Sequence, residues 1–165
     1  PTSTKGIARL NAEKNWLKLF NNFGSPVQVF RLSGIYSFEK NIINRIKEGK
    51  LKIVEKNNQF FSRIHIEDIA EILKISFQKF NPGQIFNISD DYPCSNIEIA
   101  EYASNLIKIN LPKKIKFNDI KNQTLKGFFR DSKKISNKKM KNFFQYNLKY
   151  PTFKEGLRTI SGHII

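Results

Sequence analysis

The chain has 165 residues, of which 39% are hydrophobic, and a formal net charge of +15. This length is sufficient for one domain with a buried core. No stretch reaches the ~18 uninterrupted apolar residues of a membrane span, and no charged-then-apolar leader opens the sequence, so we expect neither a membrane protein nor a secreted one. The single cysteine, Cys94, cannot form an internal disulfide, which suits a cytoplasmic location. Because the first residue is Pro1 rather than methionine, we expect the sequence to begin after its natural start.

Basic residues are densest between positions 113 and 141, where eleven of them accompany two acidic residues. Two interpretations are open. Such a surface attracts nucleic acid or acidic lipid, or lysine is the default surface residue of a chain rich in Lys, Asn, Ile and Phe. We favour the second interpretation. The alternative is a basic nucleic-acid-binding domain that stacks bases on Phe117, Phe128 and Phe129.

The first third of the chain alternates predicted helices and strands. An apolar stripe with a possible Ser or Thr cap predicts a helix over residues 5–22. A near-continuous apolar run at 27–32 predicts a buried strand, and residues 33–37 form the loop that leaves its carboxyl end. A short helix at 41–47 and a short strand at 51–54 follow.

Residues 60–73 join a predicted strand to a predicted helix. Alternation places Phe61, Arg63 and His65 on one face of the strand, and helical spacing takes over at Asp68. Asp68 followed three residues later by Glu71 fits a capping box. An arginine and a histidine on one strand face, directly before a helix, indicate part of a site wall.

The remaining elements continue the alternation. We predict a strand at 84–88, a helix at 95–108, a strand at 115–117 followed by a loop, a helix ending near 144 and a last helix that starts at 152. Capping boxes at Ser95 and Thr152 support two of these helices. Asp90-Asp91, after the strand at 84–88, are interpreted as turn residues. The order predicts an α/β fold with helices on a largely parallel sheet, which would be incomplete on its own.

Few sequence patterns in this chain predict a catalytic or binding site by themselves. Two histidines and one cysteine do not supply the clustered ligands of a metal site, so none is expected. No Gly-x-Gly-x-x-Gly or phosphate loop exists, because no two glycines stand two apart, and no nucleophile lies beside an evident base. Composition and spacing alone predict a soluble α/β domain with one suggestive strand.

Four motifs occur together in order. They are Arg-Leu-x-Gly-Ile-Tyr at 31–36, Arg-Ile-His-x-x-Asp-Ile-Ala at 63–70, Phe-Asn-Ile-Ser-Asp-Asp at 86–91 and Tyr-Pro-Thr with Glu-Gly-Leu at 150–157. With them, the chain from Ser3 to about Ile160 resembles the carboxyl-terminal half of extended, atypical short-chain dehydrogenase/reductases, the NAD(P)-dependent epimerase/dehydratase-like proteins.

The resemblance implies a fold and partners. The fold would be the carboxyl-terminal half of a doubly wound Rossmann-type parallel sheet plus a small substrate-binding subdomain. Residues 1–165 would form a partial NAD(P)-binding and substrate-binding domain, a fragment without the amino-terminal Gly-rich half. It implies NAD or NADP as cofactor, and as partners a small-molecule substrate and the missing half, with no membrane. Nucleic acid is not expected, since the resemblance covers the basic segment too.

The resemblance also implies site residues. The loop residues Leu32, Ser33, Gly34 and Ile35 would bind the cofactor beside its nicotinamide ring, at the strand ends where doubly wound folds place ligands. Tyr36 and Arg63 would wall the cleft for a small carbonyl or sugar-nucleotide substrate, and a guanidinium suits a phosphate or carboxylate. A surface ion pair is the other interpretation of Arg63. His65 is expected to be a buried structural residue rather than an acid or base, and Asp68 a helix cap.

One departure concerns catalysis. The family's Tyr-x-x-x-Lys falls on Lys5 and Arg9, and Arg9 could still hold a ribose hydroxyl of the cofactor. A lysine cannot replace a phenol in proton transfer without a large pKa shift. The sequence therefore leaves open an NAD(P)-dependent oxidoreductase or epimerase/dehydratase and a non-catalytic dinucleotide-binding sensor or scaffold.

The implied missing half also bears on stability. Its strands would cover the apolar faces of segments 27–32 and 84–88, and leaving four large side chains uncovered forfeits about 6–12 kcal/mol. This is comparable with the stability of a whole domain. We therefore expect the 165-residue chain alone to be poorly soluble and not to bind NAD(P) tightly.

Overall fold

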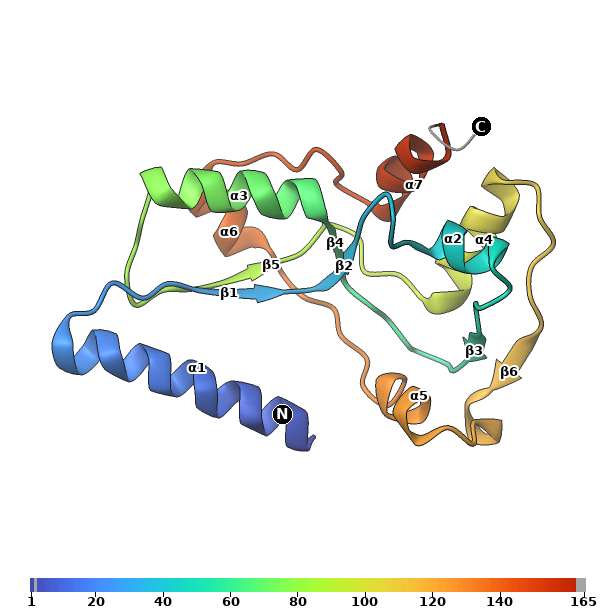
Figure 1. Cartoon of the computed structure of the whole chain (residues 1–165), viewed down its shortest axis with the longest axis horizontal. Coiled ribbons are helices and arrows are strands. Elements are labelled where there is room, and N and C mark those ends of the chain that lie inside the picture. Colours follow the sequence, from blue (N-terminus) through green and yellow to red (C-terminus); the bar gives the residue numbers. More distant parts are fainter. Residues whose placement is uncertain (2, 163–165) are drawn as a thin grey trace.

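The structure is a computed structural model that describes residue 1 and residues 3–162. In chain order its elements are α1 (Thr4–Phe23), β1 (Val29–Leu32), β2 (Gly34–Tyr36), α2 (Ile42–Lys47), β3 (Ile53–Glu55), β4 (Arg63–His65), α3 (Ile66–Gln78), β5 (Ile85–Ile88), α4 (Asn96–Leu106), β6 (Lys114–Lys116), the 3-10 helix η1 (Phe117–Asp119), α5 (Gln123–Phe128), α6 (Lys138–Phe144) and α7 (Phe153–Gly162). The predicted alternation of helices and strands is confirmed (Figure 1).

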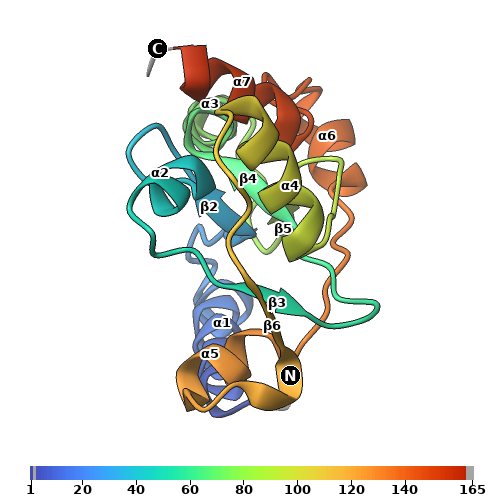
Figure 2. The same cartoon turned by 90° about the vertical axis from the view of Figure 1, so that its right-hand side faces the viewer.

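All strand pairs of the described residues are parallel, as predicted. β1 pairs with β5, β2 with β4 and β3 with β6, which gives three two-stranded sheets. Figure 2 shows β3 and β6 side by side between α4 and α5. Parallel pairs need crossover connections, and here those connections carry the helices.

Two larger apolar cores and a small third one around Val54, Ile120 and Phe129 hold the elements together. One joins β2, α2, β3, α4 and α7, with Ile43, Ile53, Ala103, Phe153 and Leu157 among its buried residues. The other lies between β5, α3 and α6, with Ile72, Phe86, Ile88, Met140 and Phe144. Because Phe86 and Ile88 are fully buried, the expectation that the strand at 84–88 lacks cover is wrong.

Helix α1 lies along β1 and shares none of these cores. It begins at Ser3, whose Oγ accepts a hydrogen bond from the Gly6 amide at 3.1 Å, and ends at Gly24 in a left-handed conformation with φ of 66°. None of its twenty residues is buried. Figure 1 shows it in blue beneath β1, running in the opposite direction.

The start of α3 differs from the prediction. His65 is the N-cap, and its Nδ1 accepts from the Glu67 amide at 3.2 Å. Asp68 lies in the first turn, fully buried, and accepts from Tyr146 Oη and the Lys149 amide at 2.7 Å each and from the Tyr150 amide at 3.1 Å. The capping role predicted for Asp68 is therefore wrong, because its carboxylate instead accepts hydrogen bonds from the segment before α7.

The loop predicted after residue 117 contains η1 and α5. The single turn and a half of α5 is too short for a hydrophobic period to show in the sequence. Tertiary contacts hold it: Lys56 Nζ donates to the carbonyls of Phe129 and Arg130 at 2.7 and 2.8 Å, and Phe129 is buried.

Candidate functional site

The carboxyl ends of β1 and β5 meet the amino ends of β2 and β4 in one place. The Ser33 amide after β1 donates to the Ile88 carbonyl of β5 at 3.0 Å. The Asp90 amide after β5 donates to the Arg63 carbonyl of β4 at 2.7 Å. These bonds join the predicted cofactor loop, Arg63 and Asp90 in one place, which we call the carboxyl-edge site.

The segment from Leu32 to Ile35, predicted as a loop, instead comprises the end of β1, Ser33 and the start of β2, and it is largely exposed at this site. The side chains of Leu32 and Ile35 are about half exposed, at 46% and 49%. The Oγ of Ser33 is buried without a hydrogen-bond partner. Gly34 lies opposite Arg63 in the β2–β4 register, and a Cβ there would approach the Ser62 carbonyl oxygen to 3.3 Å.

The first turns of α1 extend past the end of β1. Glu13 holds the helix there, accepting from Arg31 Nε at 2.8 Å. Arg9 and Lys5 are one and two turns closer to the helix start, and both are exposed. Because α1 runs opposite to β1 (Figure 1), these two cations lie on the carboxyl-edge side of the sheet.

Arg63 is held by neutral acceptors. Its Nη1 donates to the Phe61 carbonyl and to Cys94 Sγ at 3.0 Å each, and its guanidinium lies 5.9 Å from the centre of the Phe61 ring. Among the described residues no carboxylate forms an ion pair with it. The surface ion pair considered for Arg63 is therefore not what the structure shows.

Tyr36 lies in the interior rather than on an open wall. It is 8% exposed, and its ring packs edge-on against His65 at 5.0 Å. Its hydroxyl is buried without a partner, and a Cβ on Gly156 of α7 would overlap it. Burial, with the charge of Asp90 next, raises the pKa of Tyr36 far above its usual value. The buried hydroxyl of Tyr36 therefore does not line an open substrate cleft.

His65 has the structural role predicted for it. It is 4% exposed and caps α3. Burial lowers its pKa, against the opposing charges of Glu67 and Asp68. A neutral, fully packed imidazole is consistent with a structural residue.

Asp90 has the predicted turn role, and it also has a buried carboxyl oxygen without a partner that the sequence did not predict. Its Oδ1 accepts from the Tyr92 amide at 3.3 Å, as the turn interpretation requires, but its Oδ2 is buried without a partner. Burial raises the pKa of Asp90 to about 7, although the Tyr92 amide and the charge of Arg63 lower it. The sequence does place Asp90 directly after a predicted strand, and doubly wound folds bind ligands at such positions.

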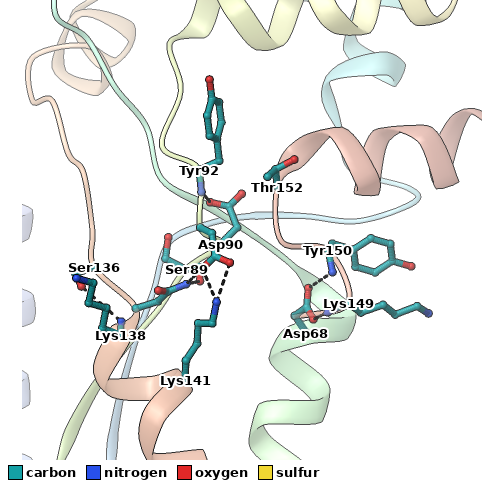
Figure 3. A network of polar contacts seen from close by, with 12 residues as sticks. Asp68, Ser89, Asp90, Tyr92, Ser136, Lys138, Lys141, Lys149, Tyr150 and Thr152 are labelled. Atoms are coloured by element: carbon teal, nitrogen blue, oxygen red, sulfur yellow. Dashed lines mark hydrogen bonds and ion pairs between the residues drawn. The ribbon is translucent and has the colours of Figure 1, made fainter. Parts of the chain in front are cut away.

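The neighbouring Asp91 is fully engaged. Lys141 Nζ donates to both of its oxygens, at 2.8 Å and 3.1 Å, and Asn137 Nδ2 donates to Oδ1 at 2.8 Å. Figure 3 shows Lys141 near Ser89 and Asp90, with the separate Asp68 cluster to one side. A pocket of about 340 Å³ lies here, lined by Asp90, Asp91, Ser136, Asn137, Lys138 and Lys141.

Two kinds of feature are missing from residues 1 and 3–162. No three His, Cys, Asp or Glu side chains group as metal ligands. No helix in this part of the chain is long and apolar enough to cross a membrane.

The edge of β1 that faces away from β5 has no strand partner in the described part of the chain. Odd-numbered residues of β1 bond to β5, as the Val29 amide does to the Gln84 carbonyl at 2.9 Å, so the amides of Phe30 and Leu32 point to the free edge. Beside that edge, a groove of about 520 Å³ separates α1 from α3, lined by Trp16, Val27, Val29, Phe30, Leu73, Phe77 and Phe80 among others. The side chains of Trp16 and Phe77 are 60% and 85% exposed.

Solved structures share this fold. A conserved protein of unknown function from Silicibacter pomeroyi is 32% identical, with a TM-score of 0.92, over 99% of this chain and 57% of that one. dTDP-glucose 4,6-dehydratase from Bacillus anthracis, solved with NAD, is 23% identical, with a TM-score of 0.78, over 98% of this chain and 52% of that one. UDP-glucose 4-epimerase from Thermotoga maritima, solved with UDP-glucose, is 15% identical, with a TM-score of 0.77, over 99% and 54%.

The chain has the fold of the carboxyl-terminal half of the extended short-chain dehydrogenase/reductases. The fold expected from the sequence resemblance is thereby confirmed. The chain spans only slightly more than half the length of these solved structures. No family model matches the chain, and no curated protein matches it.

Proposed function

We propose that this chain is the substrate-binding part of an NAD(P)-dependent oxidoreductase or epimerase/dehydratase-like protein that acts on a small carbonyl or sugar-nucleotide substrate. The observation that carries the proposal is Arg63, a fixed cation without a counterion beside the exposed segment 32–35. Buried or half-buried charges in proteins are normally paired, so a cation held only by neutral groups is suited to an anionic ligand.

The residues of this segment fit the nicotinamide end of a dinucleotide. Leu32 and Ile35 offer exposed apolar surface for a flat ring, and the partnerless Ser33 Oγ offers a hydrogen-bonding group. Arg9 would hold a ribose hydroxyl. When bound, the dinucleotide supplies a hydride donor or acceptor. The phosphate-binding glycines would come from a part of the protein outside this sequence.

Arg63 would orient the substrate by binding its phosphate or carboxylate. The Phe61 carbonyl and the Cys94 thiol fix Nη1, while the guanidinium remains partly exposed. A preoriented guanidinium loses little side-chain entropy on binding. We expect Arg63→Gln to weaken binding of an anionic substrate by about ten-fold or more, since charged hydrogen bonds contribute about 1.5–3 kcal/mol.

A second candidate function is a non-catalytic dinucleotide-binding sensor or scaffold. The observation that favours it is Lys5 at the position of the family's tyrosine, because an exposed ammonium group does not transfer protons as a phenol does. Both candidates bind the dinucleotide, but only the first turns it over.

We propose that the missing amino-terminal half packs on the open edge of β1. The free amides of Phe30 and Leu32 and the apolar groove between Trp16 and Phe77 support this partner. We also propose a cytoplasmic location, where the buried and unpaired Cys94 stays reduced.

The nucleic-acid alternative gains little support. Of the three phenylalanines proposed to stack bases, Phe129 is 3% exposed and Phe117 is half-buried against Lys56, which leaves only Phe128 on the surface. A single exposed ring, which itself stacks on Phe61 with ring centres 5.0 Å apart, does not form a stacking platform for successive bases.

The deciding experiment uses the longer protein that we propose. NADPH binding is followed by nicotinamide fluorescence, and turnover by absorbance across simple carbonyl and sugar-nucleotide substrates. Binding with turnover supports the first candidate, binding without turnover supports the sensor, and absence of NADH and NADPH binding contradicts both. Arg9→Gln should weaken dinucleotide binding, whereas Lys18→Gln, on the same helix, should not.

A further inference from the structure

Asp90 and Arg63 lie against each other at the carboxyl-edge site without forming an ion pair. The amide of Asp90 and the Oγ of Ser89 both donate to the Arg63 carbonyl, at 2.7 and 3.3 Å. Asp90 is 1% exposed, whereas Arg63 is partly exposed. These bonds join the two residues through the Arg63 carbonyl, and the charge of Arg63 acts on the buried Asp90 carboxyl group.

The Asp90 carboxyl group accepts one hydrogen bond, from the Tyr92 amide, and lies among several titratable groups, with Lys138 and Lys141 of α6 lining the adjoining pocket. Its Oδ2 has no partner, and neither does the hydroxyl of Tyr36, whose pKa Asp90 affects. The titratable and charged groups around this interior are Tyr36 from β2, Arg63 from β4, Asp68 from α3, Asp91, Tyr92 and Cys94 from the segment after β5, Tyr150 before α7 and Glu155 in α7. Arg63 is the cation whose charge stabilises ionised Asp90, and Asp91 opposes it.

The electrostatic link works in both directions. Burial places the titration of Asp90 near neutral pH. While the carboxyl group is neutral, the positive charge of Arg63 is uncompensated. When the carboxyl group ionises, it partly offsets that charge through a medium of low dielectric constant, where such effects are strong.

We propose that protonation of Asp90 regulates anion binding at Arg63, so that an anionic substrate group binds more tightly when Asp90 is neutral. This inference rests on the anion-binding role proposed for Arg63. Linkage requires the reciprocal effect: an anion bound at Arg63 disfavours the Asp90 carboxylate, so binding raises the pKa of Asp90 and takes up a proton.

Asp91 provides a matched control. It is adjacent in sequence and also follows β5, but its carboxylate is occupied by Lys141 and Asn137. Replacing it removes one negative charge from the same loop without removing the group that lies inside the fold beside Arg63.

The test uses sulfate as the probe, because its charge does not change between about pH 5.5 and pH 8.5, the range in which Asp90 titrates. Sulfate binding is measured by NMR titration of the longer protein. We expect the wild-type dissociation constant to rise about five-fold or more across this range, a typical coupling. Asp90→Asn should bind sulfate with the low-pH affinity throughout, and Asp91→Asn should follow the wild type.

The outcomes separate this inference from the proposed function. If Arg63→Gln leaves sulfate binding unchanged, the anion-binding role of Arg63 is wrong. If Arg63→Gln abolishes binding while Asp90→Asn keeps the wild-type pH dependence, the regulation by Asp90 is wrong and the role of Arg63 stands. The wild-type protein gives a check that needs no variant: carboxyl ¹³C shifts should report a higher Asp90 pKa with sulfate bound, and an unchanged pKa overturns the inference.

Discussion

Helices α7 and α1 show how differently the two ends of this molecule are packed. α7 has ten residues and buries five of them, three of which belong to a core shared with β2, α2 and α4. α1 has twenty residues and buries none, although Trp16, Leu19 and Phe23 are large and apolar. Figure 1 shows α7 packed among other elements and α1 along one side of the sheet.

This difference supports the proposal that a neighbour covers the end of the molecule at α1, here called the open end, whereas the end at α7, the closed end, buries its apolar residues within this chain. α1 already contacts the β1–β5 pair through Glu13 and through Phe20, which lies against Gly83. Its outer apolar residues therefore form a second surface. α3 repeats the pattern, with Leu73 and Phe77 exposed on the other side of the same groove.

The largest expected contrast compares two phenylalanines. Phe153→Ala, at a fully buried position of the closed end, should lower the free energy of unfolding by about 3–5 kcal/mol. Phe77→Ala, at the open end, should change it by less than about 0.5 kcal/mol in the 165-residue chain. Urea denaturation measures both.

The same pair of variants in the longer protein sharpens this comparison. If a neighbour covers the open end, Phe77→Ala should cost about 1–3 kcal/mol there. If Phe77→Ala changes the free energy of unfolding by less than about 0.5 kcal/mol in both the 165-residue chain and the longer protein, Phe77 faces solvent in both.

The next contrast concerns the hydrogen bonds by which Asp68 holds the segment before α7 at the closed end. Asp68→Ala leaves three donors of the segment 146–150 without their acceptor and should cost about 3 kcal/mol. Glu71→Ala, one turn further along α3, removes only an exposed pair with Lys74 and should cost less than about 0.5 kcal/mol. Thermal unfolding with comparable losses for the two variants would contradict the fastening role of Asp68.

A smaller effect is expected at the contact between α7 and β2. A Cβ on Gly156 would overlap the Tyr36 ring, so Gly156→Ala should destabilise the protein by about 2 kcal/mol. Gly162→Ala, near the other end of α7, meets no atom within 4 Å and should be neutral or slightly stabilising. A neutral Gly156→Ala in urea denaturation would show that this contact is loosely packed.

The smallest expected effect depends on pH. The pKa of Asp90 is raised to about 7 in the folded state, above its usual value, so the folded state holds a proton that the unfolded state releases. The stabilisation is present below about pH 4 and is lost as the pH rises through 7. Asp90→Asn should therefore exceed the wild type by about 1 kcal/mol at pH 8 and not at pH 4, as denaturation at both pH values would measure.

The sequence predicted most elements because their signals are local. Capping by Ser95 is observed, with its Oγ accepting from the Glu98 amide at 3.0 Å, and the apolar runs became parallel strands. The short helix α5 carried no such signal, since it depends on Lys56 from a distant segment. The assignment to the carboxyl-terminal half of a Rossmann-type fold came from the resemblance of the four motifs rather than from hydrophobic periodicity.

The candidate site was only partly predictable. The exposed segment 32–35 and Arg63 lie side by side, because Gly34 is opposite Arg63 in the β2–β4 pair. Tyr36 could not be recognised as buried, because its burial depends on Gly156, 120 positions away. The unpaired oxygen of Asp90 likewise results from packing between strands, which a local turn pattern does not report.

Hydrogen exchange at β1 tests the account of the open end most directly. In the 165-residue chain, the amides of Val29 and Ser33, bonded to β5, should be protected, and those of Phe30 and Leu32 should exchange fast. In the longer protein all four should be protected, because a further strand pairs with the free edge. Fast exchange of Phe30 and Leu32 in both forms would contradict the claim that this edge receives the rest of the fold.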